Sequence, residues 1–177
     1  SWEAEEGREL ADQIAVIARD LPRTFPEERR FRGPAFRAAL RRVLAAYALW
    51  DREVGYLQGM NFIGGTLLRV FSGNETHAFV VLTRLMADPK YSLRSLFQSV
   101  LEGAEAAGAE VIAALEVCDP EAAALLSAAG VTPPFFFEWF FTLFTVVLPA
   151  DLLEEVWDYV LEHGWIAVVQ VTAALLS

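Results

Sequence analysis

One short segment near the amino-terminal end places an acidic and a basic side chain three positions apart. Residues 17–26 read I-A-R-D-L-P-R-T-F-P, so Ile17, Asp20 and Arg23 recur at every third residue. On a helix that ends near Leu21, residues three apart share one face, and the Asp20 carboxylate would orient the Arg23 guanidinium. Arg23 would then project from a loop bracketed by two prolines. Taken alone, the pattern D-x-x-R is more often a surface ion pair that closes a helix.

A second segment combines a glutamine with two glycines. Residues 54–61 read V-G-Y-L-Q-G-M-N, so Gly55 and Gly59 lie on either side of Gln58. Glycine lets the backbone turn or approach a partner closely, and a glutamine side chain is both a neutral donor and an acceptor. Taken alone, this segment is typical of a turn before a helix, with Gln58 as the cap.

The sequence offers little for metal or redox chemistry. Cys118 is the only cysteine, and His77 and His163 are the only histidines. No HExxH or CxxC spacing occurs, and one cysteine cannot form an internal disulfide. We therefore expect no metal site and no cofactor held by this chain. A reducing, cytoplasmic setting is the default expectation, since no secretory signal pattern opens the sequence.

Charge is distributed unevenly along the 177 residues. The net charge is −10, and all 14 lysine and arginine side chains lie in residues 1–94. Residues 95–177 carry 12 acidic side chains and no basic ones. A surface of that kind repels phosphates, which disfavours nucleic acid as a partner and an anionic membrane for the second half. With 55% hydrophobic and 21% charged residues, the chain should fold as a single domain with a sizeable core.

Helical periodicity recurs along most of the chain, and strand alternation is hard to find, so the expected fold class is all-α. A first helix should end near Leu21, and a second should begin at Pro34. Further helices are expected at about 58–71, 74–87, 104–117, 120–129, 134–148, 151–163 and 165–176. Asn74 and Asp151 are the expected amino-terminal caps, and Gly130 and Gly164 the expected ends. Gly103 and Gly108 suggest a helix boundary or a mobile connection.

The apolar run at residues 135–148 is the one stretch that resembles a membrane span. It is about 14 residues long, is interrupted by Glu138, and is closed by Pro149. Spanning a bilayer as a helix needs roughly 20 apolar residues. The run is therefore expected to form a buried helix, and the chain is expected to have no transmembrane segment.

Together, the first two segments resemble the two signatures of the TBC-domain family, the GTPase-activating proteins of Rab GTPases. The first signature, I-x-x-D-x-x-R continuing as R-T-x-P, is matched by Ile17, Asp20, Arg23, Thr24 and Pro26. The second, Y-x-Q-G-M-N, is matched by Tyr56, Gln58, Gly59, Met60 and Asn61. A third stretch also resembles the family, although Glu138 stands where many members have arginine. The resemblance covers roughly residues 10–177, and we expect residues 1–177 to be one TBC domain, trimmed to a catalytic core and incomplete at both ends.

The resemblance implies a mechanism with two fingers inserted into a partner. Arg23 would be the arginine finger that neutralises charge developing on the γ-phosphate, and Gln58 would position the attacking water. Asp20 would orient Arg23. The remaining signature residues would support the two loops: Ile17, Thr24, Pro26, Tyr56, Gly59, Met60 and Asn61. The partner would be a Rab-family small GTPase, and GTP and Mg²⁺ would belong to that partner.

Two other functions remain open at this point. The chain could be a catalytically inactive TBC-fold module that binds a small GTPase or another partner, or a helical scaffold or lipid-binding bundle. As a GTPase activator it would be a regulator that supplies residues in trans, not a hydrolase by itself. We expect a cytoplasmic monomer that acts in vesicle trafficking, recruited to endomembranes through regions outside this chain or through the Rab.

Overall fold

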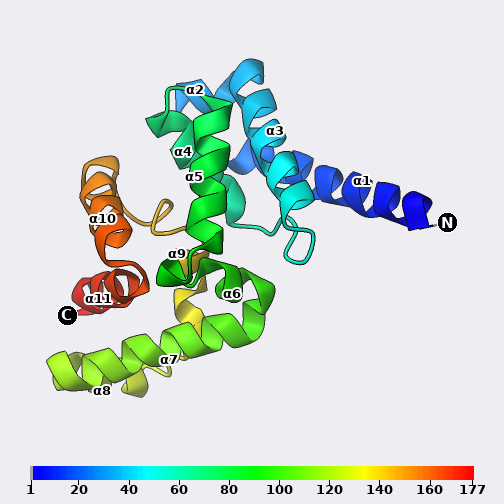
Figure 1. Cartoon of the computed structure of the whole chain (residues 1–177). Coiled ribbons are helices and arrows are strands. Elements are labelled where there is room, and N and C mark those ends of the chain that lie inside the picture. Colours follow the sequence, from blue (N-terminus) through cyan, green and yellow to red (C-terminus); the bar gives the residue numbers. More distant parts are fainter. Residues whose placement is uncertain (1) are drawn as a thin grey trace. The chain divides into compact units, whose positions relative to one another are not determined.

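The computed structural model describes residues 2–177 and is all-α, with no strand among the residues it describes (Figure 1). The chain divides into two compact units, residues 1–85 and 86–177. The first unit contains α1 (Trp2–Asp20), the 3-10 turn η1 (Leu21–Arg23), α2 (Arg29–Arg32), α3 (Pro34–Trp50), α4 (Met60–Val70) and most of α5 (Glu75–Ala87). The all-α fold class predicted from the sequence is confirmed.

The first unit is built on α3, which packs against α1 on one side and α4 on another. The buried faces carry Ile17 from α1, Leu40 and Leu44 from α3, and Ile63 from α4. A side chain on Gly64 would place its Cβ 3.2 Å from Leu44 Cδ2. The missing side chain therefore lets α4 lie close against α3, and this brings the two signature segments into the same unit.

Most of the helix starts and ends predicted for the first unit are present in the structure. α1 ends at Asp20, with a proline inside the turn that follows, and Pro34 occupies the first turn of α3. Asn74 caps α5, because its Oδ1 accepts a hydrogen bond from the His77 amide at 3.0 Å. The segment between η1 and α3, expected to be a loop, contains the four-residue helix α2, whose Phe31 is buried.

The second unit surrounds an aromatic core. Its elements are η2 (Pro89–Tyr91), α6 (Leu93–Gln98), α7 (Val100–Cys118), α8 (Pro120–Ala128), η3 (Pro133–Phe136), α9 (Phe137–Phe141), α10 (Ala150–His163) and α11 (Trp165–Leu176). α7 packs against η3 and α11, and α10 packs against α11. Gly164 ends α10 with a φ of 75°, and Gly130 follows α8 with a φ of 72°, as their positions in the sequence predicted.

The single helix predicted over 134–148 is wrong. A 3-10 turn precedes α9, α9 stops at Phe141, and Leu143 and Phe144 adopt left-handed backbone with φ of 45° and 63°. Both side chains are buried, and the Trp157 indole donates to the Leu143 carbonyl at 3.0 Å, which satisfies an acceptor freed by the break. A run that is almost entirely apolar shows no clear periodicity, so the sequence could not show where the helix stops.

Within the described part of the chain, no single helix combines the length and apolar character needed to cross a bilayer. Residues 120–128 and 133–141 reach that composition only when they are taken together, and they are bent by 105° at their junction.

Two smaller expectations in the second unit also need correction. α7 runs through Gly103 and Gly108 without a boundary, because both glycines serve close packing: a Cβ on Gly108 would lie 2.3 Å from the Pro133 carbonyl oxygen. Asp151 is not the cap of α10. The helix begins one residue earlier, after Pro149, and the Asp151 carboxylate lies in its first turn, where a negative charge suits the helix dipole.

Candidate functional site

Arg23 closes the turn at the end of α1 and is paired with Asp20. Its Nε and Nη2 both donate to Asp20 Oδ1, at 3.0 and 2.8 Å. The Arg23 side chain is 49% exposed, whereas Asp20 as a residue is only 5% exposed. The predicted pairing across three residues is confirmed: the Asp20 carboxylate is buried, and the Arg23 guanidinium reaches solvent.

The second oxygen of the same carboxylate is held by the other signature segment. Tyr56 donates its hydroxyl to Asp20 Oδ2 at 2.6 Å. Burial raises the pKa of the Tyr56 phenol well above its ordinary value, and its hydrogen bond to the Asp20 carboxylate raises that pKa further. The phenol therefore stays protonated and remains a donor. The two segments, 36 residues apart in sequence, meet at one buried carboxylate.

Thr24 and Asn61 extend this contact into a buried network. Asn61 Nδ2 donates to Thr24 Oγ1 at 2.8 Å, and Thr24 Oγ1 donates to the Asp20 carbonyl at 2.9 Å. Asn61 Oδ1 accepts from the Gly59 amide at 3.1 Å. We refer to Asp20, Thr24, Tyr56 and Asn61 as the buried polar network. It joins the end of α1 to the turn that carries Gln58.

Gln58 lies in that turn and is exposed, between buried Tyr56 and fully buried Met60. It does not cap α4. The cap position belongs to Gly59, whose φ of 110° is a conformation that favours glycine. Among the described residues the Gln58 side chain has no hydrogen-bond partner. Its amide is therefore available to a partner molecule, while its neighbours fix the backbone beneath it.

The loop after Arg23 is held in a strained form by aromatic packing. Phe25 has a φ of 44°, which is uncommon for a bulky residue. Its ring packs edge-on against Phe31, with centroids 4.8 Å apart, and against Phe62, 5.3 Å away. The Pro26 carbonyl accepts from Arg32 Nε at 2.8 Å. Of the other signature residues in this segment, Ile17 and Thr24 are buried, and Pro26 is exposed.

Gln13 supports the site and is outside both signatures. Its Oε1 accepts a hydrogen bond from the Tyr56 amide at 2.6 Å, and its amide group lies against Gly55, where an added Cβ would come within 3.0 Å. The one signal in the sequence is its position two helical turns before Asp20, which places both residues on the same face of α1.

Arg69 is a second supporting residue outside the signatures. Its Nη1 donates to Glu28 Oε1 at 2.9 Å, and its guanidinium carbon lies 5.9 Å from the centre of the Phe25 ring. The contact joins α4 to the segment that follows Arg23. No spacing in the sequence indicates this pairing, because the two charges are 41 residues apart.

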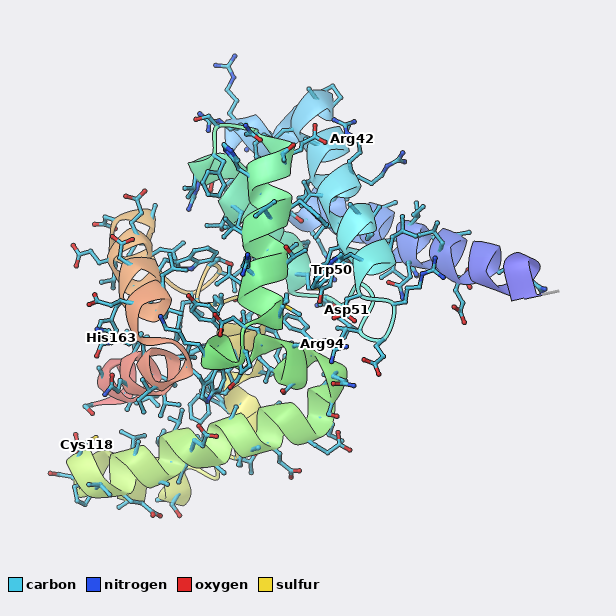
Figure 2. The ribbon with its side chains drawn as sticks, viewed as in Figure 1. Arg42, Trp50, Asp51, Arg94, Cys118 and His163 are labelled. Atoms are coloured by element: carbon cyan, nitrogen blue, oxygen red, sulfur yellow. The ribbon has the colours of Figure 1, made fainter. Side chains whose placement is uncertain are left out.

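The described residues contain no group of three or more histidine, cysteine or acidic side chains arranged to hold a metal ion. Cys118 ends α7 and is exposed, and His163 ends α10, both in the second unit (Figure 2). The chemistry that the site itself offers is therefore that of an exposed guanidinium and an exposed carboxamide, each held by a fixed backbone.

Comparison with known proteins places this geometry in a family. A family model described as the Rab-GTPase-TBC domain matches residues 3–177. The Rab GTPase-activating protein eat-17 of Caenorhabditis elegans is 33% identical over 164 residues, which are 92% of this chain and 18% of that protein. Growth hormone-regulated TBC protein 1 of Rattus norvegicus is 33% identical over 163 residues, 89% of this chain and 55% of that protein. The chain thus spans less than two thirds of the length of these relatives.

Two solved structures are similar to it. The Chlamydomonas flagellar RabGAP TBC domain has a TM-score of 0.76 and 28% identity, and the match covers 92% of this chain and 54% of that one. The Ypt/Rab-GAP domain of Gyp1p has a TM-score of 0.78 over 94% of this chain and 60% of that one, but its 19% identity supports the fold alone. Since the family model matches nearly the whole sequence, the chain belongs to the Rab-GTPase-TBC domain family.

Proposed function

We propose that the chain is a GTPase-activating protein for a Rab-type small GTPase and that it supplies Arg23 and Gln58 in trans. The observation that carries this proposal is the buried polar network. It joins the two loops of the family's signatures and leaves one guanidinium and one carboxamide exposed. The family membership and the relatives named as Rab GTPase-activating proteins support the choice of partner.

Arg23 suits the role of the arginine finger. Hydrolysis of GTP builds negative charge around the γ-phosphate, and a guanidinium is always protonated and offers a planar set of five N–H donors. Two of these donors hold Asp20, which leaves three for phosphate oxygens. Because the Asp20 carboxylate is itself held by Tyr56, Arg23 enters the GTPase with less rotational freedom to lose. A finger of this kind is worth roughly 10³–10⁵ in rate.

Gln58 suits the role of positioning the attacking water. A neutral carboxamide can accept a hydrogen bond from water and donate one to a phosphate oxygen, whereas a second charge would hold or repel either group. In the GTPase alone, this role falls to its own glutamine. GTP and Mg²⁺ come with the GTPase, and we propose that the chain works as a cytoplasmic monomer that meets its partner at endomembranes.

The test is single-turnover GTP hydrolysis across a panel of Rab proteins. The chain should accelerate hydrolysis by at least one of them, and Arg23→Ala and Gln58→Ala should each remove most of that acceleration. Arg84→Ala, which removes an exposed arginine of α5 in the same unit, is the matched control and should retain full activity. Circular dichroism should show the same helical content for all variants.

Two outcomes would overturn this assignment. Full activity of both finger variants would remove Arg23 and Gln58 from the chemistry. Tight binding of a Rab in its GTP state without any acceleration would support the inactive binding module instead.

A further inference from the structure

The segment around the arginine finger contains more arginine side chains than have a hydrogen-bond or ion-pair partner within the unit. Residues 19–42 hold eight arginines and three acidic side chains, a net charge of +5 in a chain whose total is −10. Four of the eight have partners within the unit. Arg23 pairs with Asp20, Arg32 donates to the Pro26 carbonyl, and Arg37 donates to the Phe31 carbonyl at 2.9 Å. Arg42, which is labelled in Figure 2, donates from two nitrogens to the two carboxylate oxygens of Glu75, each at 2.7 Å.

The other four are exposed and, among the described residues, have no side-chain hydrogen bond or ion pair: Arg19, Arg29, Arg30 and Arg41. Arg29 and Arg30 lie in α2, a helix of only four residues whose last turn also contains them, so the helix dipole gives no reason for or against them. Because both are exposed and unpaired among the described residues, their guanidinium groups are available to a partner molecule.

Three of these arginines border the finger loop along the chain, and we refer to Arg19, Arg29 and Arg30 as the arginine collar. Arg19 lies in the last turn of α1, four residues before Arg23. Arg29 and Arg30 lie just after the loop, and α2 is tied to it by the Arg32 contact to the Pro26 carbonyl at 2.8 Å. A molecule that receives Arg23 therefore meets a segment in which the collar residues flank the finger loop along the chain.

We propose that the arginine collar binds carboxylates on the GTPase surface that borders the nucleotide site. This inference rests on the proposed function and adds a charge requirement for the partner. Since the collar is exposed, it should act mainly by steering the encounter, which raises the association rate and makes it depend on salt. The collar should leave the chemical step unchanged, because that step needs only the guanidinium of Arg23 and the carboxamide of Gln58.

An anionic membrane would also attract arginines, but it is a poorer match to this placement. A bilayer bound at the collar would turn the finger loop toward lipid and away from the GTPase. The measurements below separate the two partners.

The test compares two variants with the same net charge. Arg29→Glu combined with Arg30→Glu alters the collar, and Arg41→Glu combined with Arg84→Glu alters exposed arginines that do not border the loop. For each, kcat and kcat/KM on the same Rab are measured from about 25 to about 200 mM salt, a range over which screening changes strongly. The collar variant should lose about tenfold in kcat/KM at low salt, show a flattened salt dependence, and keep its kcat at saturating Rab.

Equal salt dependence in the collar and control variants would overturn the inference. Vesicles containing phosphatidylserine provide the second measurement. If the collar variant loses vesicle binding but keeps the salt dependence of kcat/KM, a membrane replaces the GTPase as the partner. Failure of the proposed function is distinguishable from both results, because either the wild-type chain would then accelerate no Rab or Arg23→Ala would retain full kcat.

Discussion

The two units of the chain bury different kinds of polar side chain. Among the described residues, the first unit buries two carboxylates and an asparagine, Asp20, Asp51 and Asn61. The buried polar residues of the second unit are all threonines. Burying a carboxylate is unfavourable unless it is paired and hydrogen-bonded, and Asp20 meets this condition through Arg23 and Tyr56. Asp20 and Asn61 belong to the buried polar network that joins the loops of Arg23 and Gln58, whereas the second unit is stabilised by an aromatic core.

Charge divides along the same boundary. Residues 1–85 carry 12 basic and 11 acidic side chains, and residues 86–177 carry 2 basic and 13 acidic ones. The comparison predicts that substitutions in the aromatic core of the second unit change stability alone. Substitutions in the buried polar network of the first unit should change catalysis as well.

The largest effect on stability should come from Phe140→Ala in the second unit. Phe140 is fully buried, and its ring lies 5.6 Å from that of Trp165. Truncation should lower the free energy of unfolding by about 3–5 kcal/mol, through lost burial and an unfilled cavity. Denaturant unfolding measures this loss. At denaturant concentrations below the new unfolding midpoint, kcat per folded molecule should equal that of the wild type. A large fall in kcat would show that the second unit also affects catalysis.

Tyr56→Phe should produce the next largest effect, on stability and rate together. The change removes the donor to Asp20 Oδ2 and leaves that oxygen buried, which should lower the free energy of unfolding by about 1.5–3 kcal/mol. With Asp20 less well fixed, kcat at saturating GTPase should fall about tenfold while KM is unchanged.

Tyr47→Phe is the matched control for that variant. Tyr47 is also buried in the first unit, and its hydroxyl donates to the buried carboxylate of Asp51 at 3.3 Å. It lies outside the buried polar network, so its loss should lower stability without lowering kcat. Equal kcat values for the two variants would show that the network serves folding alone.

The smallest effect should come from Gln13→Leu. This variant removes the acceptor for the Tyr56 amide and should lower kcat about threefold and stability by about 1 kcal/mol. Gln13→Glu retains an acceptor oxygen at the same length and should recover most of the rate. If both variants have the same kcat, Gln13 does not position the loop that carries Gln58.

The sequence could predict the local features of this molecule better than the contacts between distant segments. The pairing of Asp20 with Arg23 spans three residues, so helical spacing alone predicted it. The contact of Tyr56 with Asp20 depends on how α1 and the turn before α4 pack, and no spacing rule reports that. For the same reason Gln13 was not identified as a site residue.

The errors in the predicted fold have a similar cause. The run 134–148 is mostly apolar and shows no clear helical periodicity, so its break after Phe141 follows from tertiary packing and not from a local signal. Gly108 suggested a boundary in sequence, but it is a contact point against the Pro133 backbone within a continuous helix. In both cases the structure depends on packing against residues that lie elsewhere in the chain, and the local sequence does not indicate that packing.

The most direct test of the account uses a Rab whose own water-positioning glutamine has been replaced by alanine. Single-turnover GTP hydrolysis by this Rab is measured with the wild-type chain, with Gln58→Ala and with Arg23→Ala. We expect that the wild-type chain still accelerates hydrolysis and that both variants do not. Loss of acceleration with the wild-type chain would return the glutamine role to the GTPase, and its retention with Gln58→Ala would show that neither glutamine is needed. Either result would contradict the proposal of two fingers supplied in trans.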